Sequence, residues 1–443
     1  MLIDLVIGNN LVPDPPANIM QTVLSIVQKY ILNDKFFKNN VVVFILTNLG
    51  NLCQFIFQII CIRLFVPEDF AIFGSINAYI ALVSAPVVVI PLLVSKYLIK
   101  SDDKHKSINF LINLIIKFSI ISIIICLLLH PFIKSILNIE KNIYFIVSYI
   151  ALILSAIISV CFGILQGLKK YIQFGIFHFF SLFSKLIFLL VASFFYQEII
   201  LLFIANASGI LFSILLFIIL YRKLIFSNFK LSLKNKHLDD NKIFFNNSYN
   251  FFLTSIVILF FTNIDQFLSK VLLDSKDAGI YIAASSFSKI PFFLTMNLAY
   301  VLFPEINVEN NKNSNFSKVL TVLAFISLVS ISFIILLNFY GSYIIEILYG
   351  DLYLEARRYI IILVASMMFV NLNYVILISL LVRKSSYQFI VFAIVSLIFM
   401  ILILLLNINP LIFAYVFMSY NIIIFLLLIS RFIILNLVSS NKI

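Results

Sequence analysis

Long apolar runs alternate with short polar stretches along the whole chain. A helix that crosses a bilayer needs about 20 consecutive apolar residues. Twelve runs of this kind can be marked, at about residues 40–62, 71–95, 108–129, 143–165, 173–196, 199–221, 246–269, 279–303, 318–340, 358–382, 386–406 and 410–430. None alternates with the period of two that barrel strands show, so the pattern predicts an all-α polytopic membrane protein with about twelve transmembrane helices.

The composition agrees with this class. Of 443 residues, 63% are hydrophobic and 11% are charged, and the mean hydropathy is +1.13. A water-soluble protein of this size would need far more polar surface. Residues 1–19 contain Asp4 and Asp14 but no basic residue, and "PDPP" interrupts them, so they do not resemble a cleavable signal peptide.

The basic residues lie mostly on one side of the predicted membrane. An even number of spans places both termini on the same side, and the segments on that side hold 21 of the 31 Lys and Arg residues. Loops rich in Lys and Arg stay in the cytoplasm. We therefore expect a multi-pass membrane protein with both termini cytoplasmic. This bias explains the net charge of +12 through contact with anionic membrane lipids, and no nucleic acid partner is expected.

The chain divides into two similar halves. Six spans precede the basic loop 222–242 and six follow it, and "LFVPEDFAIFGSINAY" (64–79) aligns with "LLDSKDAGIYIAASSF" (272–287) at the same place in each half. A second pair, "LQGLKKYIQF" (165–174) and "LLVRKSSYQF" (380–389), joins the fourth span to the fifth in both halves. Halves of six spans enter the membrane the same way up, which predicts two bundles with pseudo-two-fold symmetry about the membrane normal and a cavity between them.

This division gives five predicted segments. They are an N-terminal cytoplasmic extension (1–35), an N-terminal six-helix bundle (36–221), a cytoplasmic inter-bundle loop (222–245), a C-terminal six-helix bundle (246–434) and a cytoplasmic tail (435–443). For residues 1–35, a start at Met20 is the alternative to an extension.

Four charged residues fall inside the predicted spans: Lys117, Lys185, Asp265 and Lys289. Each costs about 2.5–3.5 kcal/mol at the centre of the membrane, so such residues usually face a cavity or a partner. Lys185 and Lys289 lie about ten residues, or roughly 15 Å, from either end of their spans. Lys117 is nearer an end, where a lysine can reach the membrane surface. Three lysines against one aspartate predict a cationic cavity suited to an anionic cargo.

Other polar residues share helix faces with these charges. Asn51 and Gln58 lie on one face of the first span, with Gln54 beside them, and Asn297 shares a face with Lys289. We assign Asn51, Gln58 and Asn297 to the translocation path. Hydrogen bonding between helices is the alternative role.

Asp265 has two interpretations. It can pair with one of the lysines, or it can bind H⁺ or Na⁺ and couple transport to an ion gradient, since low dielectric favours the protonated acid. Pro86 and Pro91 in the second span and Pro291 in the eighth can bend their helices, as hinges or as static kinks.

Three segments resemble a known family. "LFVPEDFAIFGSINAY" (64–79), "GILQGLKKYIQFG" (163–175) and "NIDQFLSKVLLDSKDAGIYIAASSF" (263–287) resemble the polysaccharide-flippase branch of the multidrug/oligosaccharidyl-lipid/polysaccharide exporter (MOP) superfamily, and O-antigen flippases above all. The resemblance covers about residues 36–434. It implies alternating-access transport of a lipid-linked oligosaccharide across the bacterial inner membrane, for lipopolysaccharide or another surface polysaccharide.

The resemblance also gives the charged residues expected roles. A polyprenyl diphosphate headgroup needs cationic donors, so we expect Lys185 and Lys289 to contact the diphosphate or acidic sugars, with Lys117 lower on the path. We expect no enzyme activity, no catalytic residue, no metal and no cofactor other than a coupling H⁺ or Na⁺. The expected partners are membrane lipids, the lipid-linked substrate and polysaccharide assembly proteins, and we expect a monomer.

Several alternatives stay open. A multidrug exporter of the same superfamily would favour acidic cavity residues, and only Asp265 is available. Peptidoglycan-precursor flippases usually have fourteen spans. A membrane glycan polymerase or ligase would need a large outer loop, whereas the longest one here, about 341–357, is short and contains no His. No GxxxxGK[ST] loop for ATP is present.

Overall fold

The computed structural model describes residues 35–100, 122–195, 197–226, 249–296, 312–382, 387–405 and 409–440, and these residues are almost entirely helical. Within those ranges, eight helices are long and apolar enough to cross a membrane, and a bent pair makes a ninth span. Two shorter apolar helices and one further broken helix fall at the other predicted positions. The twelve-helix layout expected from the apolar runs is therefore confirmed.

The helices of the N-terminal half follow the predicted order. They are α2 (Lys35–Leu64), α3 (Pro67–Val83), α4 (Ala85–Lys100), an apolar helix at Ser122–Leu137, α6 (Asn142–Gly167), α7 (Tyr171–Ser193) and α8 (Ile200–Phe226).

The C-terminal half repeats this plan. Its elements are α10 (Tyr249–Leu272), α11 (Ser275–Ser288), α12 (Ile290–Thr295), α14 (Lys312–Tyr349), the 3₁₀ helix η2 (Asp351–Ala356), α15 (Arg357–Val382), α16 (Tyr387–Leu405) and α17 (Pro410–Ser440).

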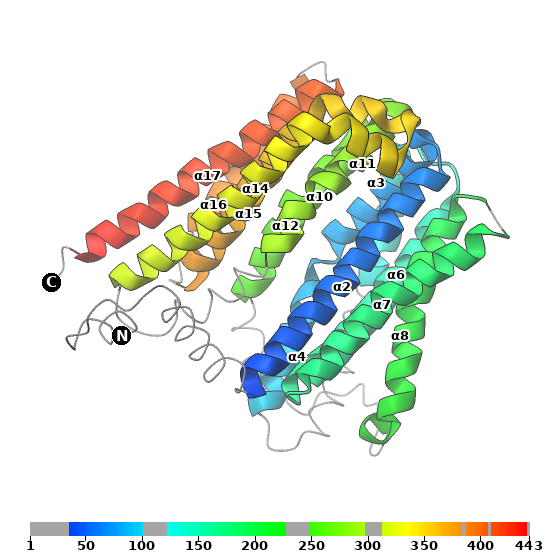
Figure 1. Ribbon diagram of the computed structural model, residues 1–443, viewed down its shortest axis with the longest axis horizontal. Coiled ribbons are helices and arrows are strands. Elements are labelled where there is room, and N and C mark those ends of the chain that lie inside the picture. Colours follow the sequence, from blue (N-terminus) through cyan, green and yellow to red (C-terminus); the bar gives the residue numbers. More distant parts are fainter. Residues whose placement is uncertain are drawn as a thin grey trace, which may run out of the picture.

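The helices form two groups that match the two halves of the chain (Figure 1). In the first group α2 packs on α7, α7 on α8, and α6 on α4 and α8; in the second, α15 packs on α14 and α17, and α16 on α17. The groups touch mainly where α3 meets α10 and α11, with α2 beside α14. Figure 1 shows them diverging from this region toward the ends where α2 begins and α17 finishes.

The region where the bundles meet, which we call the closed end, joins the two repeated segments directly. Gly279 of α11 lies so close to Pro67 of α3 that a Cβ on Gly279 would overlap the Pro67 carbonyl oxygen. Tyr353 Oη in η2 donates a hydrogen bond to the Phe65 carbonyl at 3.1 Å. Backbone therefore meets backbone across the bundles.

Arg63 adds a polar contact at the closed end. Its Nε donates to the Leu348 carbonyl at 3.0 Å, and its Nη2 donates to the carbonyls of Glu346 and Ile347. These carbonyls belong to the last turn of α14, and the Glu346 carbonyl also accepts from the Gly350 amide at 3.0 Å. An N-terminal-bundle arginine thus caps a C-terminal-bundle helix.

The ends of three helices extend beyond the sequence prediction. Residues 341–357, expected as an outer loop, are helical instead: α14 continues to Tyr349 and η2 follows. Gly350, with φ of 85°, ends α14, because glycine accepts this left-handed backbone. Likewise α17 reaches Ser440 and the helix that begins at Ser122 reaches Leu137, past the predicted ends at 430 and 129, whereas α8 is kinked at its predicted end, Tyr221, before it continues to Phe226.

Two predicted spans are broken next to proline. The axes of α3 and α4 differ by 60° across Ser84, two residues before Pro86. The eighth span breaks at Lys289, two residues before Pro291. Proline removes a backbone donor and disfavours helical geometry in the residue before it. Pro91 lies inside α4.

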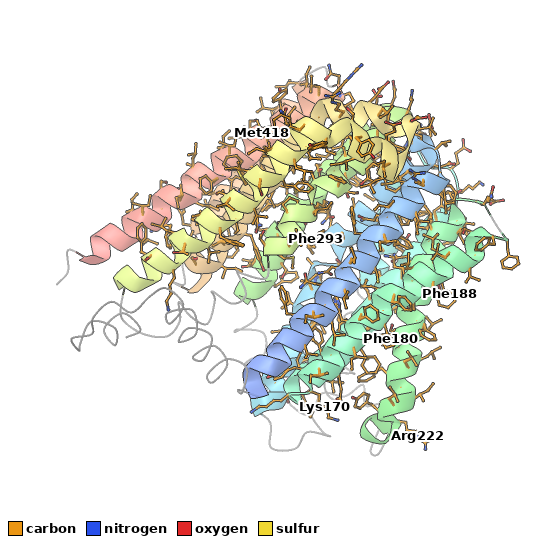
Figure 2. All side chains as sticks on the ribbon, viewed as in Figure 1. Lys170, Phe180, Phe188, Arg222, Phe293 and Met418 are labelled. Carbon is orange, nitrogen blue, oxygen red and sulfur yellow. The ribbon has the colours of Figure 1, made fainter. Side chains whose placement is uncertain are left out.

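The outward-facing side chains suit a lipid environment. Figure 2 shows Phe180 and Phe188 along α7, and both are exposed in the isolated chain. Lys170 and Arg222 lie at the end where α7 begins and α8 finishes (Figure 2), and the Lys170 ammonium lies 4.9 Å from the centre of the Tyr221 ring. The protein is therefore a multi-pass membrane protein with basic side chains at the end of this bundle.

Candidate substrate site

Lys185 lies inside the N-terminal bundle and does not face lipid. Its side chain is 8% exposed, and its Nζ donates a hydrogen bond to Gln54 Oε1 of α2 at 2.8 Å. The ammonium also lies 4.2 Å from the centre of the Phe57 ring, which is cation–π geometry. Gly209 of α8 allows the close approach of α7, since a Cβ there would lie 2.6 Å from Lys185 Cα. Helices α2, α7 and α8 together position this charge.

Lys289 occupies the break between α11 and α12. Its side chain is 7% exposed, and its Nζ lies 3.5 Å from Asn263 Oδ1 of α10. Within the described residues, Lys289 forms no ion pair at 4.0 Å or less. Asp265 is nevertheless near enough to interact with it electrostatically.

Both lysine sites adjoin the contact between the bundles. Phe55, next to Gln54 in α2, has its ring centre 6.1 Å from that of Phe287, two residues before Lys289. One turn after Asn263, the Phe267 ring lies 6.4 Å from the Tyr79 ring of α3. Each bundle therefore contains a buried cation close in sequence or structure to residues that contact the other bundle.

Asp265 faces into the C-terminal bundle. At 100° per residue it lies on the opposite side of α10 from Asn263, and it is fully buried. Its Oδ2 accepts a hydrogen bond from Ser285 of α11, while its Oδ1 has no partner among the described residues. Gln266 extends this contact by donating to Ser285 at 3.2 Å and Ser286 at 3.1 Å.

Tyr281 lies close to the acid. It is fully buried, its hydroxyl has no hydrogen-bond partner among the described residues, and Asp265 acts on it electrostatically. Its ring stacks on Tyr359 with centres 5.7 Å apart. Asp265 Oδ1 and the Tyr281 hydroxyl are therefore two buried polar atoms without hydrogen-bond partners among the described residues.

The other predicted site residues lie in several places. Asn51 and Gln58 are half-buried on α2, on the same side of the helix as Phe55. Pro86 and Pro291 lie beside the two helix breaks described above, and Pro91 lies further along α4. Lys117 and Asn297 lie outside the described residues.

The structure also adds residues that the sequence analysis did not assign to the site. Gln54 and Asn263 hold the two lysines, and Ser285 holds Asp265. A second buried polar group joins α15 and α17: Asn373 Nδ2 donates to the Asn421 carbonyl, and Asn421 Nδ2 donates to Ser366 Oγ, both at 3.0 Å. Among the described residues, no group of three or more His, Cys, Asp or Glu side chains is placed to hold a metal ion.

Comparison with protein families identifies the chain. A family model described as "Polysaccharide biosynthesis protein" matches residues 36–308, more than half of the sequence, so the chain belongs to this family. No functionally curated protein matches it in sequence.

Solved structures place its fold among transporters. It resembles "Lipid II flippase MurJ, inward closed conformation", with a TM-score of 0.65, 20% identity and 87% of each chain covered. It also resembles a multidrug resistance MATE family transporter of the MOP superfamily in an inward-facing conformation, with a TM-score of 0.64, 13% identity, and 87% of this chain and 94% of that one covered. For a eukaryotic MATE transporter the TM-score is 0.61, with 15% identity and coverages of 90% and 96%.

The family and the fold agree. The structures that the chain resembles are transporters and a flippase rather than enzymes. The chain therefore belongs to a polysaccharide biosynthesis family and has the fold of MOP-superfamily transporters.

Proposed function

We propose that the protein moves a polyprenyl-diphosphate-linked oligosaccharide, such as an O-antigen repeat unit, across the bacterial inner membrane by alternating access. The observation that supports this most is the pair of buried lysines, Lys185 in the N-terminal bundle and Lys289 in the C-terminal bundle. A diphosphate that leaves water needs such donors. Membership of a polysaccharide biosynthesis family and likeness to a lipid II flippase agree with a lipid-linked glycan as cargo.

The path is proposed to follow the boundary between the bundles. Asn51 and Gln58 line it from α2, and Asn297 and Lys117 continue it toward the cytoplasm. With both termini in the cytoplasm, the end where the bundles diverge faces the cytoplasm, and the headgroup enters there while the lipid tail stays in the bilayer. Polysaccharide assembly proteins would receive the cargo on the other side, and the carrier itself works as a monomer.

Ion coupling is proposed to reside at Asp265. Its Oδ1 has no hydrogen-bond partner among the described residues, and its position within the C-terminal bundle keeps it off the lipid surface. Binding of H⁺ or Na⁺ there would neutralise a fully buried charge. The break at Lys289 lies next to this group, so ion binding and bending of α11–α12 can be linked.

Substituting the lysines tests the function. In a deletion strain complemented with Lys185→Ala or Lys289→Ala, we expect surface polysaccharide to fall at least tenfold and lipid-linked repeat units to accumulate inside, at normal protein levels. Wild-type surface polysaccharide in both variants would overturn the proposal.

The second candidate function is multidrug export, which the likeness to MATE transporters supports. Drug sensitivity of the same deletion strain distinguishes the two. A strain that becomes drug-sensitive but retains its surface polysaccharide would favour the exporter.

A further inference from the structure

Each buried lysine is held by a neutral amide. Gln54 Oε1 accepts from Lys185, and Asn263 Oδ1 accepts from Lys289. Both amides come from the first helix of their own bundle, and in the repeat alignment their positions differ by a single residue. The lysines themselves come from different spans, α7 and the α11–α12 break, so the shared feature is the amide and its place.

A neutral acceptor has a particular electrostatic effect. An ammonium has three donors, and an amide oxygen fixes the direction of one of them while leaving the positive charge uncancelled. A carboxylate in the same place would form an ion pair and remove most of the attraction for an anion. The two amides therefore orient the cations and keep them available.

The orientation of Asn263 is set by its own helix. Its Nδ2 donates to the Leu259 carbonyl at 3.0 Å and to Thr262 Oγ1 at 2.9 Å. With the nitrogen held on that side, the oxygen is the atom that faces Lys289. The amide thus presents an acceptor and not a donor to the ammonium.

Both amides border the surface between the bundles. Gln54 is half-buried, and at 100° per residue it lies between the buried α2 stripe that contains Phe57 and the stripe that contains Phe55. Asn263 is half-buried one turn before Phe267, which meets Tyr79 of the other bundle. A headgroup that passes along this boundary reaches the amides first and the ammonium groups directly behind them.

We propose that Gln54 and Asn263 are positioning residues that direct Lys185 and Lys289 toward an anionic phosphate headgroup without neutralising them. This inference rests on the proposed function, because it assumes that the lysines meet the cargo. The inference adds Gln54 and Asn263 to the residues of the proposed substrate site, and it requires a neutral side chain at each of these two positions.

Charge and shape can be separated at these positions. Gln54→Glu and Asn263→Asp keep the shape and the acceptor but add a negative charge. Gln54→Met and Asn263→Leu remove the acceptor and leave the lysine charged. If the amides only served as hydrogen-bond acceptors for a buried lysine, the acidic variants would weaken anion binding less than the Met and Leu variants. If the amides keep the lysine charge available, the acidic variants weaken anion binding more than the Met and Leu variants.

Binding of farnesyl diphosphate to the purified full-length protein in detergent is the measurement, with farnesol as the uncharged probe. We expect Gln54→Glu and Asn263→Asp each to raise the Kd for farnesyl diphosphate about tenfold or more, since opposing charges in an interface are costly. The Met and Leu variants should raise it less, and farnesol should bind all variants equally. If one acidic variant fails to fold, the acidic variant at the other position is sufficient to test the inference.

Two matched controls exist in the same chain. Gln173→Glu lies on α7, where Gln173 is exposed and accepts from Tyr221 Oη at 2.6 Å. Asn409→Asp lies before α17, where Asn409 accepts from the Ile412 amide at 2.8 Å and Asp is an equally good N-cap. Both should bind farnesyl diphosphate as the wild type does.

The outcomes separate the inference from the function. Acidic variants that bind farnesyl diphosphate as tightly as the wild type, or more tightly than the Met and Leu variants, overturn the positioning role. If Lys185→Ala and Lys289→Ala bind it normally as well, the proposed function fails together with the inference. If only the lysine variants lose affinity, the function stands and the inference alone fails.

Discussion

Lys185 and Lys289 are both buried lysines held by amides, yet their surroundings differ. Lys185 lies in the middle of a continuous helix, with a 2.8 Å hydrogen bond, a ring at 4.2 Å and the α8 backbone against its own. Lys289 lies where two helices separate, with a 3.5 Å contact and an acid nearby. Lys185 is therefore held in a rigid part of the N-terminal bundle, while Lys289 lies at a point of the C-terminal bundle where the backbone can bend.

This difference suggests a division of work between the bundles. Lys185 Nζ donates to Gln54 Oε1, whereas Asp265 Oδ1 and the Tyr281 hydroxyl have no hydrogen-bond partners among the described residues. A buried group without a partner is costly, so it is expected where a ligand or a second conformation supplies one. We therefore expect the N-terminal site to anchor the cargo and the C-terminal site to respond to the ion.

The strongest test of this contrast is Asp265→Asn. The substitution keeps an acceptor for Ser285 but removes the ionisable group that binds the coupling ion in the proposed mechanism. We expect polysaccharide export to fall by about 100-fold, which corresponds to about 2.8 kcal/mol, and the residual export to be unaffected by dissipation of the H⁺ or Na⁺ gradient. Binding of farnesyl diphosphate should persist through Lys185. Export that still collapses on adding an ionophore, as in the wild type, would remove Asp265 from coupling.

A smaller effect is expected from Gly209→Ala, which tests whether the Lys185 site is rigid. The new Cβ would lie 2.6 Å from Lys185 Cα and 2.7 Å from its N, so α7 and α8 must separate. Overpacking of this kind costs about 1–3 kcal/mol, and we expect a lower unfolding temperature in detergent.

Gly341→Ala is the matched control for that substitution. Its Cβ would meet only Leu337 Cβ, at 4.0 Å, inside α14. Replacing a mid-helix glycine by alanine stabilises by roughly 0.5–1 kcal/mol. Equal unfolding temperatures for the two variants would show that the Lys185 site accommodates an added methyl group as easily as an open helix surface does.

The smallest effect is expected from Pro291→Ala, which tests whether the Lys289 site must bend. Alanine restores a backbone donor and allows α11 and α12 to join more readily. We expect a few-fold slower export with unchanged binding of farnesyl diphosphate. Pro410→Ala, at the first position of α17 where proline is tolerated, should leave export unchanged. A wild-type export rate in Pro291→Ala would make this break a static kink.

The amino-acid pattern predicted the coarse structure well, because apolar runs and proline act locally. Twelve spans, two bundles and the breaks beside Pro86 and Pro291 all follow from neighbours along the chain. The depth of Lys185 and Lys289 followed in the same way from the length of their spans. The end of α14 did not, since hydropathy alone does not show that a helix continues to Gly350.

The partners of the charged residues could not be predicted from the pattern. Gln54 and Lys185 are 131 residues apart, and the choice of Gln54 over Asn51 or Gln58 depends on how α2 is rotated against α7. Asn263 and Lys289 are 26 residues apart, and their contact depends on how α11 packs against α10 next to the junction of α11 and α12. Helix rotation and helix bending arise from packing, and a single sequence does not record them.

Gly279 has a consequence for how readily the closed end forms. Most contacts between domains must immobilise flexible side chains, and each one ordered costs conformational entropy. At Gly279 and Pro67 one partner has no side chain and the other has a rigid ring, so almost no rotamer freedom is lost when the surfaces meet. Association and separation of the bundles at this point should therefore be nearly neutral entropically, which leaves the direction of the cycle to be set by the cargo and the ion.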